Sequence, residues 1–400
     1  MLKKRFFSIF ISLVITMLLI SSISIMAQEE TIKIGVVGPR TGPAAATGVA
    51  FEEGIELALD YINTTKGGIL GKKVEVIFED TGGVPEKAAS AIEKLITRDK
   101  VSIVVGESHS SCALAEIEIA NRYEVPFIIA EAWVDEVTSK GYKWIFRAGP
   151  CNSGVVDNII QWIVAEDFKK IMIVAENTDW GLGIKKLSEE GLQKEGIPYN
   201  SIITAVESQE YYTELNKIID YAPDLILAYI YGFGVHDFIA QAYEVGLSPA
   251  NALILEGAGP PSLWPEFWEN VGEAGELECF VSAMHSKVEL TEVAKRFRED
   301  YVKKFNREPT DYKSRSIYNV LLIAADAIER AGSTDGEEIV KALEETELEV
   351  ASGVVKFGLE PGTVKYHQWQ PPMLIIQWQN REQIVVFPKE AATGELKRGK

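Results

Sequence analysis

The feature that most constrains this sequence is an alternation of short β-branched runs with amphipathic stretches, which begins at Thr31 and continues to about Arg147. In the longer stretches apolar residues recur at helical spacing, whereas the short runs are rich in the β-branched residues that favour strands. Such alternation is typical of βαβ units with a parallel sheet and right-handed crossovers. It predicts strands at 32–37, 74–78, 103–105 and 127–129 and helices at 51–62, 88–96 and 114–123.

The pattern restarts after Gly149-Pro150, so the sequence predicts two similar α/β lobes in succession. A chain of 400 residues also has about the length of two domains. The elements predicted for the second lobe are strands at 170–175, 202–205, 225–229 and 252–255 and helices at 155–164, 183–193, 212–219 and 235–243. The remaining elements are helices at 288–305, 316–331 and 337–343, which fit over either sheet, and a terminal hairpin of 373–378 with 384–387.

The N-terminus has the form of a secretory signal peptide. Basic residues at 3–5 precede an apolar run at 6–20, and small residues lead to Ala27. We therefore predict a signal peptide over residues 1–27 and an exported protein, located in the periplasm or on the outer face of the cell membrane. Because Ile25 stands where a cleavage site prefers a small residue, an uncleaved N-terminal membrane anchor remains the alternative.

The composition is that of an acidic globular protein. The formal net charge is −19 at pH 7, with 46% hydrophobic and 25% charged residues. A strongly acidic surface argues against nucleic acids and anionic membranes as partners.

Motifs for catalysis, cofactors and metals are incomplete. Residues 106–110 resemble the turn of a hydrolase nucleophile, but Ser110 stands where the last glycine is required. The glycine pairs at 181–183 and 232–234 lack the third glycine of a dinucleotide-binding loop. The three cysteines allow at most one disulfide, and neither they nor the four histidines have metal-ligand spacing. The sequence therefore predicts no catalytic activity, no cofactor and no metal site.

Polar turns follow two predicted strands of the first lobe, at Thr41-Gly42-Pro43 and at residues 106–111. Open α/β sheets hold small ligands at the carboxyl ends of their strands. Ser110 and Ser111 open a helix there, so their hydroxyl groups and free backbone amides can hold a carboxylate against the positive end of the helix. A plain helix N-cap has the same sequence, and both interpretations stay open at this point.

Further short motifs occur along the chain in a fixed order. They are Ile34-Gly35-Val36-Val37-Gly38, Thr41-Gly42-Pro43, Gly67-Gly68-Ile69-Leu70-Gly71, Glu79-Asp80, Ser110-Ser111, Trp180-Gly181, Pro223-Asp224, Glu244-Val245-Gly246-Leu247 and His367-Gln368-Trp369-Gln370-Pro371-Pro372. In this order and spacing the chain from Ile32 to about Pro388 resembles the branched-chain amino-acid (Leu/Ile/Val) binding proteins of ABC importers, a family of type I periplasmic solute-binding proteins.

The resemblance implies an α/β fold of two Rossmann-like lobes with parallel-sheet cores, joined by three hinge crossovers. Each lobe is then discontinuous. The N-terminal lobe comprises residues 31–147 and 283–360, and the C-terminal lobe comprises residues 148–282 and 361–400. Receptors of this kind close around one ligand by a hinge motion.

The resemblance also implies ligand-binding residues. Ser110 matches the serine that binds the ligand carboxylate, and Glu256 matches the glutamate that neutralises the ligand ammonium group. Tyr231 matches a tyrosine of the cleft, and Trp180 matches an aromatic residue that caps the ligand from the second lobe. The alternative roles are a solvated acid for Glu256 and core packing for the two rings.

The sequence departs from the family at the turn Glu131-Ala132-Trp133, where the family has an Ala-Ala-Thr type of turn. Trp133 replaces the threonine that touches both ends of an amino acid. An acid at Glu131 beside a large ring suits a cationic, amide-bearing or shorter ligand, unless Glu131 turns outward. His109 stands where a cysteine is common, so the disulfide of some relatives is not expected.

The function implied by the resemblance is capture of an amino acid, of the branched-chain type or related, and its delivery to the permease and ATPase subunits of an ABC importer. Two alternatives remain. One is a receptor for short amides, urea or another small polar or cationic metabolite, and the other is a sensory ligand-binding protein. The predicted ligand-binding residues are Ser110, Ser111, Glu131, Ala132, Trp133, Trp180, Tyr231 and Glu256.

Overall fold

The structure is a computed structural model that describes residues 31–206, 208–257, 261–264, 266–283, 291–309 and 312–399. The predicted signal peptide lies outside these residues. Within the described ranges, no helix combines the length and the apolar character that crossing a bilayer requires.

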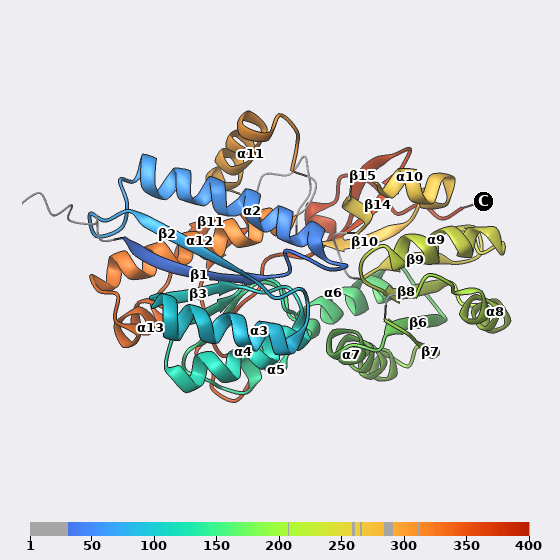
Figure 1. Ribbon diagram of the computed structural model, residues 1–400. Helices are drawn as coiled ribbons and strands as arrows, with labels where there is room; N and C mark the ends of the chain where they lie inside the picture. Colours follow the sequence, from blue (N-terminus) through green and yellow to red (C-terminus); the bar gives the residue numbers. More distant parts are fainter. Residues whose placement is uncertain are drawn as a thin grey trace, which may run out of the picture.

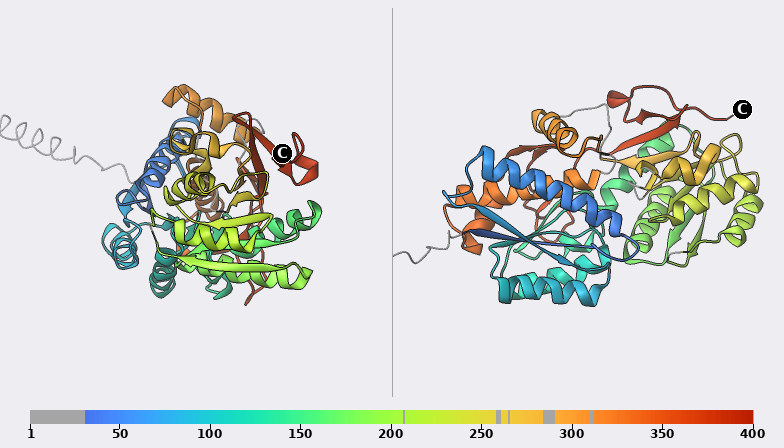
Figure 2. Two further views of the ribbon diagram at one scale, coloured as in Figure 1. Left: turned by 90° about the vertical axis from the view of Figure 1, so that its right-hand side faces the viewer. Right: turned by 45° about the horizontal axis from the view of Figure 1, so that its top comes forward.

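Two α/β lobes lie side by side, which confirms the predicted fold class (Figures 1 and 2). The first lobe is built on a six-stranded sheet of order β13-β5-β4-β3-β1-β2, in which all neighbours are parallel. Its strands are β1 (Ile32–Gly38), β2 (Val74–Asp80), β3 (Ile103–Gly106), β4 (Phe127–Ile129), β5 (Ile145–Ala148) and β13 (Gln368–Trp369).

Helices cover both faces of the first sheet, with α2 and α12 on one face and α3 and α4 on the other (Figure 1). The late helices α11 to α13 share the buried core of this lobe. The helices of the lobe are α2 (Ala45–Asp60), α3 (Pro85–Lys94), α4 (Ser110–Tyr123), α5 (Glu136–Ser139), α11 (Glu292–Phe305), α12 (Tyr312–Ala331) and α13 (Gly336–Glu344), and a small ribbon of β11 (Leu348–Val350) with β12 (Gly353–Val355) is added.

The second lobe is built on a seven-stranded sheet of order β15-β14-β10-β9-β8-β6-β7. Strands β6 to β10 are parallel, whereas the C-terminal hairpin of β14 and β15 adds two antiparallel strands at one edge. The elements are β6 (Ile171–Glu176), β7 (Tyr199–Thr204), β8 (Leu225–Tyr229), β9 (Leu253–Glu256), β10 (Cys279–Ser282), β14 (Leu374–Gln379) and β15 (Glu382–Phe387), with helices α6 (Asn152–Ala165), α7 (Asp179–Glu195), α8 (Tyr212–Tyr221), α9 (Gly234–Glu244) and α10 (Phe267–Val271).

The chain crosses between the lobes three times: after β5, after β10 and after β13. Part of the second crossover lies outside the described residues. The third crossover differs from the predicted boundary at residue 361, because Gln368–Trp369 still pairs with β5 of the first sheet. Strands β5, β10 and β13 were not predicted; each is at most four residues long, and β5 contains a charged residue, Arg147.

Arg147 organises the junction between the lobes. Its guanidinium group is fully buried, and Nη1 donates to the carbonyl oxygens of Ala132, at 2.9 Å, and Val134, at 2.7 Å. Nε donates to Gln368 Oε1 from the third crossover, and Gln368 Nε2 in turn donates to the carbonyl oxygen of Gly149, at 2.8 Å. This network therefore sets the position of residues 131–133 relative to two crossovers.

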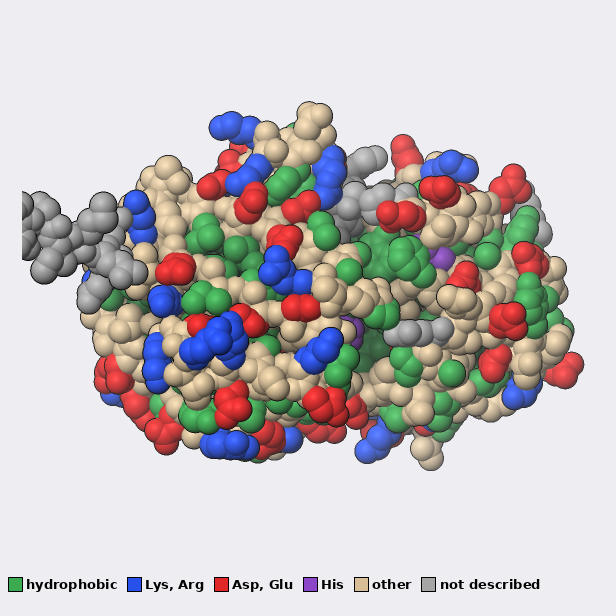
Figure 3. All heavy atoms as spheres, viewed as in Figure 1, with side chains coloured by type: hydrophobic (Ala, Val, Ile, Leu, Met, Phe, Trp, Pro, Cys, Tyr) green, Lys and Arg blue, Asp and Glu red, His purple; other side chains and the backbone are tan. Residues whose placement is uncertain are grey.

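The three cysteines, Cys112, Cys151 and Cys279, are free and buried. Acidic side chains are spread over both lobes on the face shown in Figure 3, and that face is hollowed between the lobes.

Candidate ligand-binding cleft

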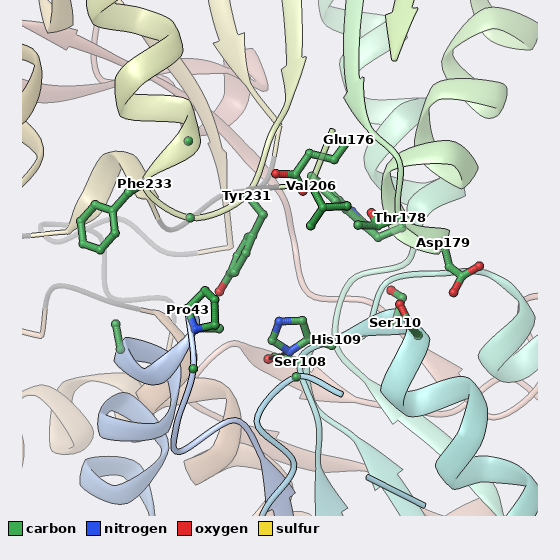
Figure 4. Close-up of a pocket in the computed structure, with 18 of the residues that line it drawn as sticks. Pro43, Ser108, His109, Ser110, Glu176, Thr178, Asp179, Val206, Tyr231 and Phe233 are labelled. Atoms are coloured by element: carbon green, nitrogen blue, oxygen red, sulfur yellow. Dashed lines mark hydrogen bonds between the residues drawn. The ribbon is translucent and has the colours of Figure 1, made fainter. Parts of the chain in front are cut away.

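A cavity of about 1010 Å³ lies between the two lobes. Both parallel sheets direct their carboxyl ends toward it, which is where this class of sheet presents polar turns. Figure 4 shows Pro43, Ser108, His109 and Ser110 of the first lobe facing residues of the second lobe across the cavity. The lining comes from residues 42–46, 82–83, 108–111, 131, 133, 312 and 313 of the first lobe and 176–180, 182, 206, 208, 209, 231–234 and 237 of the second.

The cavity brings together six of the eight predicted residues: Ser110, Ser111, Glu131, Trp133, Trp180 and Tyr231. Ala132 and Glu256 are not among its lining residues. Glu256 is fully buried, and Ser262 Oγ lies 3.3 Å from Glu256 Oε2 and 3.0 Å from Glu278 Oε1. Burial, followed by the charge of Glu256, raises the pKa of Glu278 well above its ordinary value. Glu256 thus belongs to a buried pair of carboxyl groups beneath the short helix Pro261–Leu263.

The N-terminus of α4 opens onto the cavity. Ser110 is the first helical residue, and among the described residues no side chain caps this end. Ser110 Oγ accepts a hydrogen bond from the backbone N–H of Val134, at 3.2 Å, so its own proton can be donated to an acceptor in the cavity. The plain N-cap interpretation of Ser110 is therefore not what the structure has.

The turn before α4 is held by a buried carboxylate. Glu107 adopts φ +53°, and its Oε1 accepts the backbone N–H groups of Ser108, at 2.7 Å, and His109, at 2.8 Å. Burial by itself would raise the pKa of Glu107, but the hydrogen bond from His109 and these backbone bonds lower it. The preceding Gly106 has φ +124°, and a Cβ there would lie 2.2 Å from the carbonyl oxygen of Val37, so only glycine fits.

Glu131 faces the cavity rather than turning outward. Glu131 is only 3% exposed and lines the cavity, and its Oε2 accepts a hydrogen bond from Trp133 Nε1 at 3.3 Å. Glu131 Oε1 is buried and has no hydrogen-bond partner among the described residues. Burial raises the pKa of Glu131 to about 7, an effect that Ser316, Lys313, Tyr312 and Trp133 oppose.

Two tryptophans meet across the cavity. The Trp133 and Trp180 rings have centroids 6.3 Å apart at an interplanar angle of 78°, an edge-to-face contact between opposite lobes. The carbonyl oxygen of Trp133 accepts the backbone N–H of Asn152 at 2.7 Å. Trp133 therefore packs with the core of the second lobe although its backbone belongs to the first.

Sequence reasoning missed a polar bridge between the lobes. Lys313 of α12, only 3% exposed, donates to Thr47 Oγ1 of α2 at 2.9 Å and to the Tyr231 hydroxyl group. Its ammonium group lies 4.5 Å from the centre of the Tyr231 ring, and the Thr47 and Tyr231 hydroxyl groups are 3.0 Å apart. A lysine in the first turn of a helix opposes the helix dipole and so needs another role, but the sequence did not offer this signal, because the helix was predicted to begin at residue 316 and α12 begins at Tyr312.

A model of the periplasmic binding protein family matches residues 31–383, and the chain therefore belongs to that family. It is a solute-binding protein of the ABC transporter type, and not an enzyme. The Leu/Ile/Val-binding protein homolog 7 of Brucella suis biovar 1 (strain 1330) is 23% identical over 381 residues, which cover 92% of this chain and 94% of the relative.

Solved structures show the same similarity. The leucine-binding protein LivK of Thermotoga maritima aligns with a TM-score of 0.79 and 25% identity, covering 89% of this chain and 97% of that one. The substrate-binding protein LivJ of the branched-chain amino-acid transporter of Streptococcus pneumoniae, in complex with isoleucine, aligns with a TM-score of 0.79 and 26% identity. The alignment covers 92% of this chain and 100% of that one. A solute-binding protein of Rhodopseudomonas palustris in complex with benzoate shares the fold, with a TM-score of 0.75 and 20% identity.

Proposed function

We propose that this protein captures an amino acid in the cleft between its lobes, outside the cytoplasm, and delivers it to the permease and ATPase subunits of an ABC importer. The observation that carries the proposal is the pair of opposite poles in one cavity. The N-terminus of α4 with Ser110 and Ser111 offers hydrogen-bond donors, and the buried carboxyl group of Glu131 offers an acceptor. An amino acid carries the matching carboxylate and ammonium groups.

Each pole has a physical reason to hold its part of the ligand. Free amides and the helix dipole at the N-terminus of α4 favour an anion. A buried carboxylate oxygen without a hydrogen-bond partner, such as Glu131 Oε1, is costly, and a ligand ammonium group beside it removes that cost. In this arrangement Glu131 takes the role that the family resemblance gave to Glu256.

The walls and the relatives support an amino acid over an aromatic acid. Trp133, Trp180 and Tyr231 provide apolar surface around the two poles. The relatives of known structure include proteins for leucine and isoleucine and one that binds benzoate. Benzoate has a carboxylate but no positive group, so it offers nothing to pair with Glu131 Oε1.

The test is calorimetric titration of the purified protein, refolded to remove carried-over ligand. The panel contains the twenty amino acids, benzoate, urea and short amides. At least one amino acid is expected to bind in a 1:1 ratio and, at a hundredfold excess over its dissociation constant, to stabilise the fold by about 2.7 kcal/mol.

Two derivatives of that amino acid serve as matched controls. The N-acetyl form lacks the ammonium group and the amide form lacks the carboxylate, so both are expected to bind at least tenfold more weakly. Binding of benzoate without binding of any amino acid would contradict the proposal, as would equal affinity for the N-acetyl form.

Tyr231→Phe is expected to weaken ligand binding about tenfold. The substitution keeps the ring but removes the hydroxyl group that meets Lys313 and Thr47 of the other lobe. Because this contact joins the two lobes, its loss is expected to lower the population of the closed form, and the apparent affinity falls with that population. Calorimetry measures the affinity, and X-ray scattering without ligand measures closure through the radius of gyration.

The control is Tyr243→Phe, since Tyr243 is 46% exposed on the second lobe. That variant should match the wild type in both measurements. A Tyr231→Phe protein with unchanged affinity and an unchanged radius of gyration would show that the bridge does not hold the lobes together.

A further inference from the structure

The second-lobe wall of the cavity is acidic. Glu176 ends β6, is only 4% exposed and extends into the cavity, as Figure 4 shows. Asp179 and Asp237 line the same wall. Among the described residues that line the cavity from this lobe there is no lysine, arginine or histidine, and the basic lining residues His109 and Lys313 both belong to the first lobe.

The same wall is rich in aromatic rings. Trp180, Tyr231 and Phe233 line the cavity on the side that carries Glu176. Aromatic faces attract cations, and a desolvated carboxylate binds a cationic donor more strongly than a neutral one. A cavity wall that combines a buried carboxylate with aromatic rings is therefore a suitable environment for an ammonium or guanidinium group.

Three positions in the cavity then bind three parts of one ligand. The two poles described above hold the carboxylate and ammonium groups of the amino acid backbone, at α4 and at Glu131. The volume of about 1010 Å³ leaves room for a long side chain to reach the second lobe.

We propose that Glu176 is a specificity-determining residue that binds a positive group at the end of the ligand side chain, so that the preferred ligand is a basic amino acid. This inference rests on the proposed function. It goes further by naming the class of side chain and the residue that selects it.

Glu176→Gln tests the inference, because it removes the charge and keeps the shape. The probes are lysine and arginine, with norleucine as the neutral analogue of lysine. The wild type is expected to bind a basic amino acid at least tenfold more tightly than norleucine. In the variant, affinity for the basic ligand should fall about 30-fold or more while affinity for norleucine stays the same.

Glu190→Gln is the matched control. Glu190 belongs to helix α7 of the same lobe and undergoes the same change of charge, but its side chain is 59% exposed and does not line the cavity. The affinity of this variant for lysine and arginine should stay within threefold of the wild type. An effect of Glu190→Gln as large as that of Glu176→Gln would overturn the assignment to Glu176, because a general negative potential would then explain both.

The wild-type measurements give a test that does not depend on how the variant folds. Wild-type protein that binds norleucine or leucine but not lysine or arginine would overturn this inference and leave the proposed function standing. Protein that binds none of these probes, and no other amino acid of the calorimetric panel, would overturn both. Equal losses for norleucine and lysine in Glu176→Gln would also overturn the selective role.

Discussion

Arg147→Met is expected to lower the free energy of unfolding by about 3 kcal/mol or more. The guanidinium group is fully buried and donates to the carbonyl oxygens of Ala132 and Val134 and to Gln368 Oε1. Methionine fills part of the volume but donates no hydrogen bond, so these buried oxygen atoms lose their partners. Each unsatisfied buried acceptor costs about 1–3 kcal/mol.

The same substitution should also weaken ligand binding, since the two carbonyl groups belong to the turn that carries Glu131 and Trp133 into the cavity. Urea unfolding without ligand measures the stability, and calorimetry measures the affinity. Arg98→Met is the control, because the Arg98 side chain is 71% exposed. The control should change stability by no more than about 0.5 kcal/mol. An Arg147→Met protein as stable as the wild type would contradict the role given to this network.

Glu131→Gln is expected to raise the free energy of unfolding near pH 8 and to weaken ligand binding. Burial raises the pKa of Glu131 from 4.5 to about 7, so the folded protein holds this proton at a pH where the unfolded chain has lost it. The resulting contribution to stability is fully present below about pH 4.5 and is lost as the pH rises through about 7. Without ligand, wild type and variant should be equally stable near pH 4, and the variant more stable by up to about 3 kcal/mol near pH 8.

For binding, the expected effect of Glu131→Gln is a loss of about 30-fold or more in affinity for the amino acid, because the ammonium group loses a charged partner. The ammonium group favours the ionised form of Glu131, so binding to the wild type near pH 7 should release part of a proton. Titrations in two buffers of different ionisation enthalpy measure that release, which the variant should not show.

The control for Glu131→Gln is Glu124→Gln, since Glu124 is exposed at the end of α4. It should change neither the pH dependence of stability nor the affinity. A Glu131→Gln protein that is less stable than the wild type at pH 8, or that binds with unchanged affinity, would contradict the description of Glu131 as a desolvated ligand-binding carboxylate.

Local patterns in the sequence were sufficient for the main elements of the fold. The apolar runs at 171–175 and 225–229 lie in fully buried strands inside the second sheet, as continuous apolar runs predict for parallel sheets. The C-terminal hairpin also matched closely, with strands Leu374–Gln379 and Glu382–Phe387. The polar turn before α4 lies at the cavity because it follows the carboxyl end of a parallel strand, a position that the local order of strand, turn and helix predicts.

Distant contacts determined the features that sequence reasoning missed. Strand β13 is two residues long and pairs with β5, where Gln368 also meets Arg147, which lies 221 positions away. Lys313 and Thr47 are 266 positions apart, and no periodicity along the chain connects them. The burial of Glu256 could likewise not be predicted from the sequence, since the second carboxyl group of the buried pair belongs to Glu278, which directly precedes the next strand, β10.

The sequence by itself determined the class of fold, the number of lobes and the ends of strands at which polar turns gather, because these follow from periodicity and from turn residues within short windows. Only the tertiary structure decided which charged groups face the cavity. Glu131 lies at the cavity in a turn whose carbonyl groups accept hydrogen bonds from Arg147. Glu256 is instead buried and accepts a hydrogen bond from Ser262. The physical reason is that burial and pairing of a charge depend on the groups that folding brings around it, and these come from elements far apart in the chain.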